Sequence, residues 1–441
     1  MKGSLLTVKK QITSKKIKMK QGLTYLFLSS MMCTLLVVGC TTTTPTVKEI
    51  SRIDYDWESS PFHPQFQCYH FSEDSTELML KMKSKELLYT RKDPQSPFVA
   101  KVNCWVLIEE RRPEGFAFID STTLTVSDAN PDKTSRLVVS KTNIALPTNE
   151  TTFRFTFKLK DTNRRWEQTE YLYTTKKSTP GRDDFQLFVN SNTLPVFGSQ
   201  IQSGDFLTFT SDRFEGNWNF AQWQDEERLP APPYTETRIT IPFPPEEGLN
   251  AWVENDLGKE TQEGRFSLFT SNNEHIWTLL VANDYFPEVH MLDEMTQSLR
   301  YISSKKEFER ITSSEATRKK EIDEFWLDCG GSKERSRELI RIYYSRVEEA
   351  NYYFSSYVEG WKSDRGLIHI VFGNPNSIRY GADYETWTYG EENNLTSITF
   401  NFRKVDNPLA SNHFVLDRNP IFRTQWDRAI TAWRNGRIFQ E

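Results

Sequence analysis

Apolar and polar residues alternate in several runs between residues 55 and 180, which restricts these runs to half-buried β-strands. In FRFTFKL (153–159) every second residue is apolar, and the runs 77–83 and 101–110 repeat the pattern. Because successive side chains of a strand point to opposite faces, each run can bury one face and expose the other. Short strands separated by polar turns predict a β-sandwich-like domain over residues 55–180.

A second β-rich domain is predicted over residues 181–290. Between its strands lies a stretch rich in Trp and Pro, residues 215–234, which indicates a long loop. Such a loop can bind a peptide or a glycan, or it can pack its aromatic side chains onto its own sheet. The runs expected to form strands are 184–189, 203–211, 237–243 and 264–271.

From about residue 291 the apolar residues recur at helical spacing instead. Ser304 and Glu307 are spaced as a capping box, which predicts a helix start. Ser332, just after a Gly-Gly turn, can cap a long helix that continues to about residue 354. The aromatic stripe of this helix predicts a core face and no cofactor site.

Residues after this helix predict a small antiparallel sheet. LIHIVF (367–372) is apolar on both faces, which is typical of a strand covered on both sides, and the runs 385–390 and 396–404 predict two more strands. The predicted fold class is therefore mainly β with a C-terminal α+β module: two β-sandwich-like domains, then helices and a small antiparallel sheet over residues 291–441.

The charge of the chain argues against one class of partner. Residues 1–40 carry seven Lys and no Asp, Glu or Arg, and removing these seven charges from the net charge of −5 leaves about −12 for residues 41–441. Nucleic-acid binding depends on neutralising phosphates with Lys and Arg, so an acidic chain without a basic stripe is a poor candidate for it. We expect no nucleic-acid partner.

The first 40 residues indicate export. A Lys-rich start precedes the apolar run 23–40, which Ser and Thr interrupt and which is short for a membrane span. The run ends in Val-Val-Gly-Cys, which resembles the bacterial lipobox. The resemblance implies a signal peptide over residues 1–39, cleavage before Cys40 and lipidation of Cys40. The Thr-rich start of residues 40–54 predicts a tether. Met19 is an alternative start that leaves a signal of normal length.

Besides the lipidated Cys40, three cysteines remain in the processed chain. Cys68 and Cys104 lie in strand-like runs of the same predicted domain, whereas Cys329 lies in the helical region. Export permits a disulfide between the first two, and two buried free thiols are the alternative. No CxxC or Cys/His spacing indicates a metal site, and we expect no cofactor.

The densest motif is GWKSDRGLIHIVFGNPNSI (360–378), which combines a Trp, an Asp-Arg-Gly turn, an apolar run and a Gly-Asn-Pro-Asn turn. With the downstream ETWTY it resembles the GWxTD domain, a C-terminal module of bacterial exported proteins and lipoproteins. The resemblance covers about residues 290–441, although CGGSKERS (329–336) replaces the Pro-rich linker of the family. The matching residues are Gly360, Trp361, Ser363 in place of Thr, Asp364, Arg365, Gly366, Gly373, Pro375, Trp387 and Tyr389, with Phe325, Trp326, Asp328, Arg346, Val347, Ala350, Asn351 and Phe354 upstream.

The resemblance supplies no established catalytic activity, and the motifs HExxH, GxSxG, Walker A and GxGxxG are absent from the sequence. Asp364, Arg365, His369 and Glu385 could converge as an acid/base site. Alternatively, Asp364 and Arg365 lock a turn and His369 is a satisfied core side chain. We expect Trp361 to be a buried structural anchor between the long helix and the strand predicted from residue 367.

Together these features predict an exported, lipid-anchored protein of the cell envelope, at the outer membrane and facing the periplasm. We expect it to act as a binding, scaffold or assembly module with a protein partner, and to reach the membrane through its lipid anchor. We assign it no catalytic, cofactor-binding or metal-binding residue. The alternative is an envelope enzyme with its acid/base site around Asp364, Arg365 and His369.

Overall fold

The structure is a computed structural model, and it describes Tyr55 and residues 60–439 apart from short gaps. The predicted signal peptide, Cys40 and residues 41–54 of the tether lie outside the described residues. The gaps within residues 60–439 are 130, 132–133, 191, 225–227, 239, 243, 245–248, 253–258, 382, 392–396, 406, 408 and 411.

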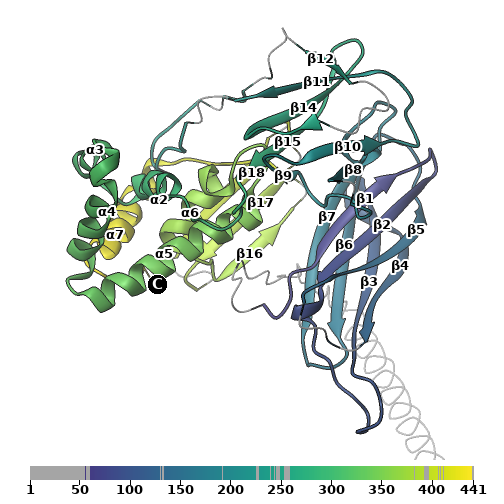
Figure 1. The fold of residues 1–441 in the computed structure, drawn as a ribbon, viewed down its shortest axis with the longest axis horizontal. Helices are drawn as coiled ribbons and strands as arrows, with labels where there is room; N and C mark the ends of the chain where they lie inside the picture. Colours follow the sequence, from purple (N-terminus) through teal and green to yellow (C-terminus); the bar gives the residue numbers. More distant parts are fainter. Residues whose placement is uncertain are drawn as a thin grey trace, which may run out of the picture. The chain divides into compact units, whose positions relative to one another are not determined.

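The fold is mainly β with a C-terminal α+β part, as the sequence predicted (Figure 1). In the first part, two antiparallel sheets, ordered β1-β2-β5 and β4-β3-β6-β7, share one apolar core. The alternating residues of the runs 77–83, 101–110 and 153–159 all contribute to this core. The elements are β1 (Gln65–His70), β2 (Ser75–Lys83), η1 (Ser84–Glu86), β3 (Val99–Arg112), β4 (Gly115–Ala129), β5 (Leu137–Ala145), β6 (Thr152–Asp161) and β7 (Glu167–Thr175).

Cys68 on β1 and Cys104 on β3 are buried and form no disulfide. Burial raises the pKa of both thiols, that of Cys104 to about 12. Of the two alternatives that the sequence left open, the structure therefore favours buried free thiols.

The next region holds a three-stranded sheet, β13-β10-β8, and a five-stranded sheet, β12-β11-β14-β15-β9. Leu187, Leu207, Phe266 and Leu279 are among the residues that fill the core between them. The elements are η2 (Arg182–Asp184), β8 (Gln186–Val189), β9 (Gln200–Gln202), β10 (Phe206–Thr210), β11 (Trp218–Trp223), β12 (Asn250–Trp252), β13 (Lys259–Glu260), β14 (Gly264–Thr270) and β15 (His275–Ala282).

Two predictions for this region are wrong. The described residues of the run 237–243 form no strand. Pro242, near the end of the run, has no N–H to donate to a neighbouring strand. Conversely, Trp218–Trp223 of the predicted loop form β11, which pairs with both β12 and β14. Phe220 and Ala221 of β11 are buried, so part of the aromatic stretch is a strand that packs onto its own sheet.

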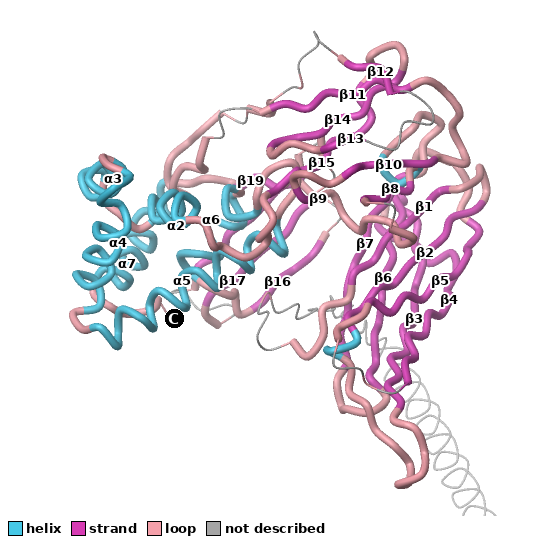
Figure 2. Tube along the Cα trace, viewed as in Figure 1, coloured by secondary structure: helices cyan, strands magenta, loops and turns pink. Residues whose placement is uncertain are grey.

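Helices dominate the C-terminal part (Figure 2). Both predicted caps are present: Ser304 and Glu307 form a capping box, and the Ser332 hydroxyl accepts from the N–H of Arg335. Among the described residues, none of the helices combines the length and the apolar character needed to cross a membrane. The helices are α2 (Leu292–Ser298), η3 (Leu299–Tyr301), α3 (Lys305–Thr312), α4 (Glu315–Gly330), α5 (Lys333–Phe354), η4 (Gly360–Lys362), α6 (Asp364–Phe372), η5 (Pro420–Phe422) and α7 (Arg423–Arg434).

The antiparallel sheet of this part has the order β16-β17-β18-β19, and it includes both strands that the sequence predicted downstream of the motif. Ile398, Phe400 and Phe402 of β18 face one way and are buried, as expected. The strands are β16 (Ser377–Tyr380), β17 (Tyr384–Tyr389), β18 (Ile398–Lys404) and β19 (Phe414–Leu416).

The run 367–372 is a helix, α6, and the predicted strand is wrong. A short run that is apolar on every side fits a buried helix as well as a buried strand, so periodicity alone cannot separate the two. Ser363 decides the outcome, because its hydroxyl accepts from the Gly366 N–H and starts a helix. Every residue of α6 is buried.

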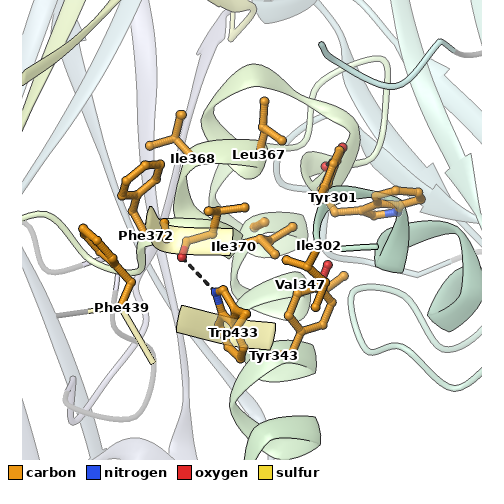
Figure 3. Packing of buried hydrophobic residues seen from close by; sticks show 14 of the residues in the cluster. Tyr301, Ile302, Tyr343, Val347, Leu367, Ile368, Ile370, Phe372, Trp433 and Phe439 are labelled. Carbon is orange, nitrogen blue, oxygen red and sulfur yellow. Dashed lines mark hydrogen bonds between the residues drawn. The ribbon is translucent and has the colours of Figure 1, made fainter. Parts of the chain in front are cut away.

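One core joins α5, α6, α7 and the four-stranded sheet. Figure 3 shows Trp433 of α7 among Tyr343, Ile370 and Phe439 of this core. The Trp433 indole Nε1 donates to the backbone oxygen of Val371 at 3.0 Å. This core is the scaffold that holds the motif 360–378.

Candidate functional site

The motif begins in the η4 turn, where the chain passes from α5 to α6, and its glycines are required by close packing. A Cβ added to Gly360 would lie 1.7 Å from the backbone oxygen of Ala350 on α5. A Cβ added to Gly366 would lie 2.0 Å from the backbone oxygen of Gly360. Real Cβ atoms do not approach oxygen this closely, so only glycine lets these three segments meet.

Trp361 is buried, as predicted, with 2% of its surface exposed. Its backbone oxygen accepts from the Tyr301 hydroxyl at 2.7 Å, and its indole Nε1 donates to Glu359 at 2.5 Å. Its backbone N–H donates to the Asn351 side chain of α5. Because residues 367–372 form a helix, the ring lies against helical segments and not against the strand that the sequence placed there.

Ser363 keeps the hydroxyl that the family pattern has at this position, and the structure shows its use. Its Oγ accepts from the Gly366 N–H at 3.0 Å and donates to the backbone oxygen of Gly360 at 2.6 Å. One hydroxyl therefore caps α6 and closes the turn before it.

Asp364 is buried and is fully occupied by N–H donors. Arg418 binds both of its carboxylate oxygens, at 2.9 and 2.5 Å, and the backbone N–H of Leu416 donates to Oδ2 at 2.8 Å. This two-point geometry is the strong form of an arginine–carboxylate pair. The pair ties the first turn of α6 to β19 and the residues after it.

Arg365 is buried beside Asp364 and joins a different part of the sheet. Its Nη1 donates to Glu385 on β17 at 2.8 Å, and its Nη2 donates to the backbone and side-chain oxygens of Asn412. The guanidinium lies over the rings of Phe354 and Phe414, with 4.3 Å to the centroid of the second. Arg365 thus holds the sheet against α5 and α6.

His369 of α6 is completely buried, and its Nε2 lies 2.8 Å from Glu349 on α5. Of the suggested acid/base group, the structure therefore brings together only Arg365 and Glu385. His369 pairs instead with Glu349, and Asp364 pairs with Arg418. These two partners were missed by the sequence analysis, because Arg418 and Glu349 lie outside the motif. With its oxygens accepting three N–H groups, Asp364 is placed as a structural anchor.

The remaining motif residues close the turn between α6 and β16. Gly373 has a φ of 83°, and a Cβ there would lie 2.4 Å from the guanidinium of Arg346. The Tyr389 hydroxyl donates to the backbone oxygen of Gly373 at 2.8 Å. Pro375 follows in the turn. Trp387 of β17 is buried, and its indole Nε1 donates to Glu385 at 3.0 Å.

A cavity of about 930 Å³ opens beside this motif, and Arg365 and Glu385 form part of its wall. β1, β7 and α5 also contribute to the wall, as do residues 197–200, 287–288 and 290, so residues from the first β-sandwich and from the C-terminal part line one space. Cavities of this size hold drug-sized molecules or a few residues of a peptide. Further lining residues include Gln65, Phe66, Glu170, Leu172, Ser345 and Glu348.

Five tyrosines of the cavity wall form a continuous group, called here the tyrosine cluster (Tyr55, Tyr171, Tyr352, Tyr353 and Tyr380). Tyr171 of β7 lies 5.8 Å from Tyr380 of β16, centroid to centroid. The Tyr380 hydroxyl donates to that of Tyr55 at 3.0 Å, and the Tyr55 ring lies 5.1 Å from that of Tyr353. Tyr353 and Tyr352 pack at right angles on α5. The cluster therefore links β7, β16 and α5.

The tyrosine cluster is connected to the motif through Glu385. The Tyr55 hydroxyl donates to Glu385 Oε2 at 3.3 Å, while Arg365 binds Oε1 of the same carboxylate. Burial raises the pKa of Tyr55 and of Tyr380 well above the ordinary value, so both hydroxyls keep their protons. Arg365 therefore positions one wall of the cavity through a chain of hydrogen bonds.

The match with a known family covers this whole arrangement of motif, helices and sheet, from β14 to the end of α7. Residues 264–435 are a GWxTD domain. The match confirms the resemblance suggested by the motif residues. A comparison with curated proteins gave no match.

Solved structures gave weak similarities. One is the Bacteroides uniformis β-glucuronidase 2, at 12% identity over 33% of this chain and 14% of that chain, with a TM-score of 0.17. Another is a glycosyl hydrolase family 2 member from Bacteroides cellulosilyticus, at 12% identity over 33% of this chain and 18% of that chain, with a TM-score of 0.19. This chain thus spans less than a fifth of either protein.

The GWxTD domain begins in β14, and one buried contact connects that strand to the motif. Arg265 donates from Nε to the backbone oxygen of Tyr357 at 2.9 Å, just before the η4 turn. Its guanidinium also lies over the rings of Trp223 and Tyr357. Among the described residues no group of three or more His, Cys, Asp or Glu side chains is arranged to hold a metal ion.

Proposed function

We propose that this protein is an exported, lipid-anchored protein of the cell envelope, held at the outer membrane and facing the periplasm, that binds a partner in the cavity beside the GWxTD motif. The predicted signal peptide and lipobox support the location. The cavity supports the binding role, and no catalytic step is part of the proposal.

One observation carries the binding role: the motif builds a cavity wall. Arg365 and Glu385 are tied to each other and to the tyrosine cluster, and both border the 930 Å³ space. A motif that only closed the core would not need to border a cavity lined by tyrosines. Buried ion pairs hold preorganised side chains in place, which lowers the entropy that binding must overcome.

Site-specific photo-cross-linking in intact cells tests this function. A photoreactive amino acid at Ser345, in the cavity wall on α5, should capture a discrete partner. The same amino acid at Phe118, an exposed position on β4, is the control and should not capture it. If position 345 captures nothing, or only what position 118 also captures, the cavity is not a binding site.

A further inference from the structure

The chemistry of the cavity wall identifies what the cavity can hold, and the inference that follows rests on the binding role proposed above. Five glutamates line the cavity. Three of them already face a basic or imidazole side chain: Glu385 with Arg365, Glu349 with His369, and Glu288 with His290. Carboxylates paired in this way have little attraction left for a ligand.

Glu170 on β7 and Glu348 on α5 differ from these three. Glu170 accepts from the Gln168 amide at 2.6 Å, and Glu348 accepts from the backbone N–H of Val289 at 3.1 Å. Within the part of the chain that the structure describes, neither carboxylate forms an ion pair. Each can therefore accept a cation that the protein itself does not supply.

Desolvation disfavours the ionised form of these two carboxylates. Burial raises the pKa of Glu170 to about 7, and burial also raises the pKa of Glu348 above its usual range. A cation placed beside a buried carboxylate compensates this loss of solvation. A positive charge beside these two carboxylates would therefore favour their ionised form.

The surroundings of Glu170 favour the same ligand. The groups that interact with it electrostatically are Tyr55, Tyr352, Tyr380 and His63. Three of these belong to the tyrosine cluster, whose ring faces attract ammonium and guanidinium groups and pack against their apolar stems. His63 is held by Glu86 and by the ring of Tyr352.

We propose that the cavity binds a peptide segment of an envelope partner through its lysine or arginine side chains, which pair with Glu170 and Glu348 and pack against the tyrosine cluster. The volume favours a peptide over a free amine, because 930 Å³ exceeds the space that one cationic side chain fills. The occupant is a basic segment, complementary to the carboxylates of Glu170 and Glu348, although Lys83 and Lys404 also line the cavity.

The test measures binding of two pools of labelled pentapeptides to the purified full chain in detergent, by fluorescence anisotropy. One pool carries one or two Lys or Arg per peptide, and the matched pool carries norleucine at those positions. The basic pool should bind about tenfold more tightly or better, since hydrogen bonds to charged groups are stronger than those between neutral groups. Glu170→Gln should reduce this difference, because only Glu348 then remains to pair with the cation, and it should not lower the melting temperature.

The matched control is Glu167→Gln on the same strand. Glu167 is 71% exposed and pairs with Lys160, so this change should leave binding of the basic pool unaltered. A pool of free small amines that binds as tightly as the basic peptides would overturn the assignment to a peptide. Equal binding of the basic and norleucine pools, or unchanged binding by Glu170→Gln, would overturn the assignment to a cation.

The pH dependence supplies an independent readout. Because Glu170 has a pKa of about 7, it is mostly protonated at pH 6 and mostly ionised at pH 8. Binding of the basic pool should therefore strengthen about tenfold between these values. Histidine side chains also titrate near neutral pH, so His63→Gln is the control: the dependence should persist there and weaken in Glu170→Gln.

These outcomes separate the two proposals. Capture at position 345 together with equal binding of both peptide pools would leave the cavity as a binding site and refute only its preference for cations. Absence of capture at position 345, with neither pool bound, would refute the binding role and the cation preference together.

Discussion

Single residues in the GWxTD motif are explained by space and by hydrogen bonding. Gly360 and Gly366 are needed because a Cβ at either position would overlap a backbone oxygen, and Gly373 because its φ is positive. Ser363 retains the family's hydroxyl because that group caps α6. These roles concern the fold, whereas Arg365 has a second one, since it also forms part of the cavity wall.

At this scale we predict that Trp361→Ala lowers the free energy of unfolding by about 3–5 kcal/mol, because it leaves a large void in the core. Urea denaturation of the full chain measures the change. The matched control is Trp105→Ala: Trp105 is 51% exposed, so its loss should change stability little. If Trp361→Ala unfolds like the wild type but loses cavity binding, Trp361 is a binding residue and its structural role is refuted.

The element that decides the geometry of the site is α6. Ser363 starts this helix, and all of its residues are buried. Two neighbouring residues of its first turn form ion pairs with different parts of the sheet region. Asp364 reaches Arg418 beyond β19, and Arg365 reaches Glu385 on β17. The helix thereby fixes the four-stranded sheet against α5 at the point where the cavity opens.

We predict that Asp364→Asn destabilises the protein by about 3–5 kcal/mol, because it leaves the buried Arg418 without its carboxylate. Thermal and urea unfolding measure the effect. The control is Asp323→Asn, which breaks an exposed i,i+4 pair with Lys319 and should cost less than about 1 kcal/mol. An Asp364→Asn protein that melts normally yet loses activity or binding would contradict the structural role and favour the enzyme alternative.

At the scale of the whole molecule, the C-terminal module is joined to residues that precede the first sandwich. Tyr55 lies just after the predicted tether, yet its ring packs on Tyr353, Phe354 and Trp387 of the GWxTD domain. The wall of the cavity likewise combines β1 and β7 with α5 and β16. The GWxTD domain is therefore completed by residues from the other end of the chain.

Lipid anchoring belongs to this scale. We predict that the wild-type protein sediments with membranes and that Cys40→Ala moves it to the soluble fraction, because each buried CH₂ of an acyl chain contributes roughly 0.8 kcal/mol. Fractionation with fatty-acid labelling measures both. Cys33→Ala, which lies in the apolar run but outside the lipobox, is the control and should behave like the wild type. Unlabelled Cys40→Ala protein that remains in the membrane fraction would refute the lipoprotein assignment.

The sequence alone predicted the features that depend on neighbours within the chain. Alternation identified β2, β3 and β6, because side-chain direction along a strand is a local property. The caps at Ser304 and Ser332 were found for the same reason. The motif spacing identified the GWxTD domain. Local pattern failed at residues 237–243, whose described residues form no strand, and at 367–372, where an apolar run fits helix and strand equally.

Only the tertiary structure decided the partners of the charged groups and the existence of the cavity. Asp364 pairs with Arg418, and His369 pairs with Glu349. The partners are too far apart in the sequence for residue spacing to predict the pairs. Glu170 and Tyr55 belong to no sequence motif. They become part of one site because β7 and Tyr55 pack beside α5 and β16. Burial and charge pairing depend on which surfaces meet, so they are properties of the folded chain.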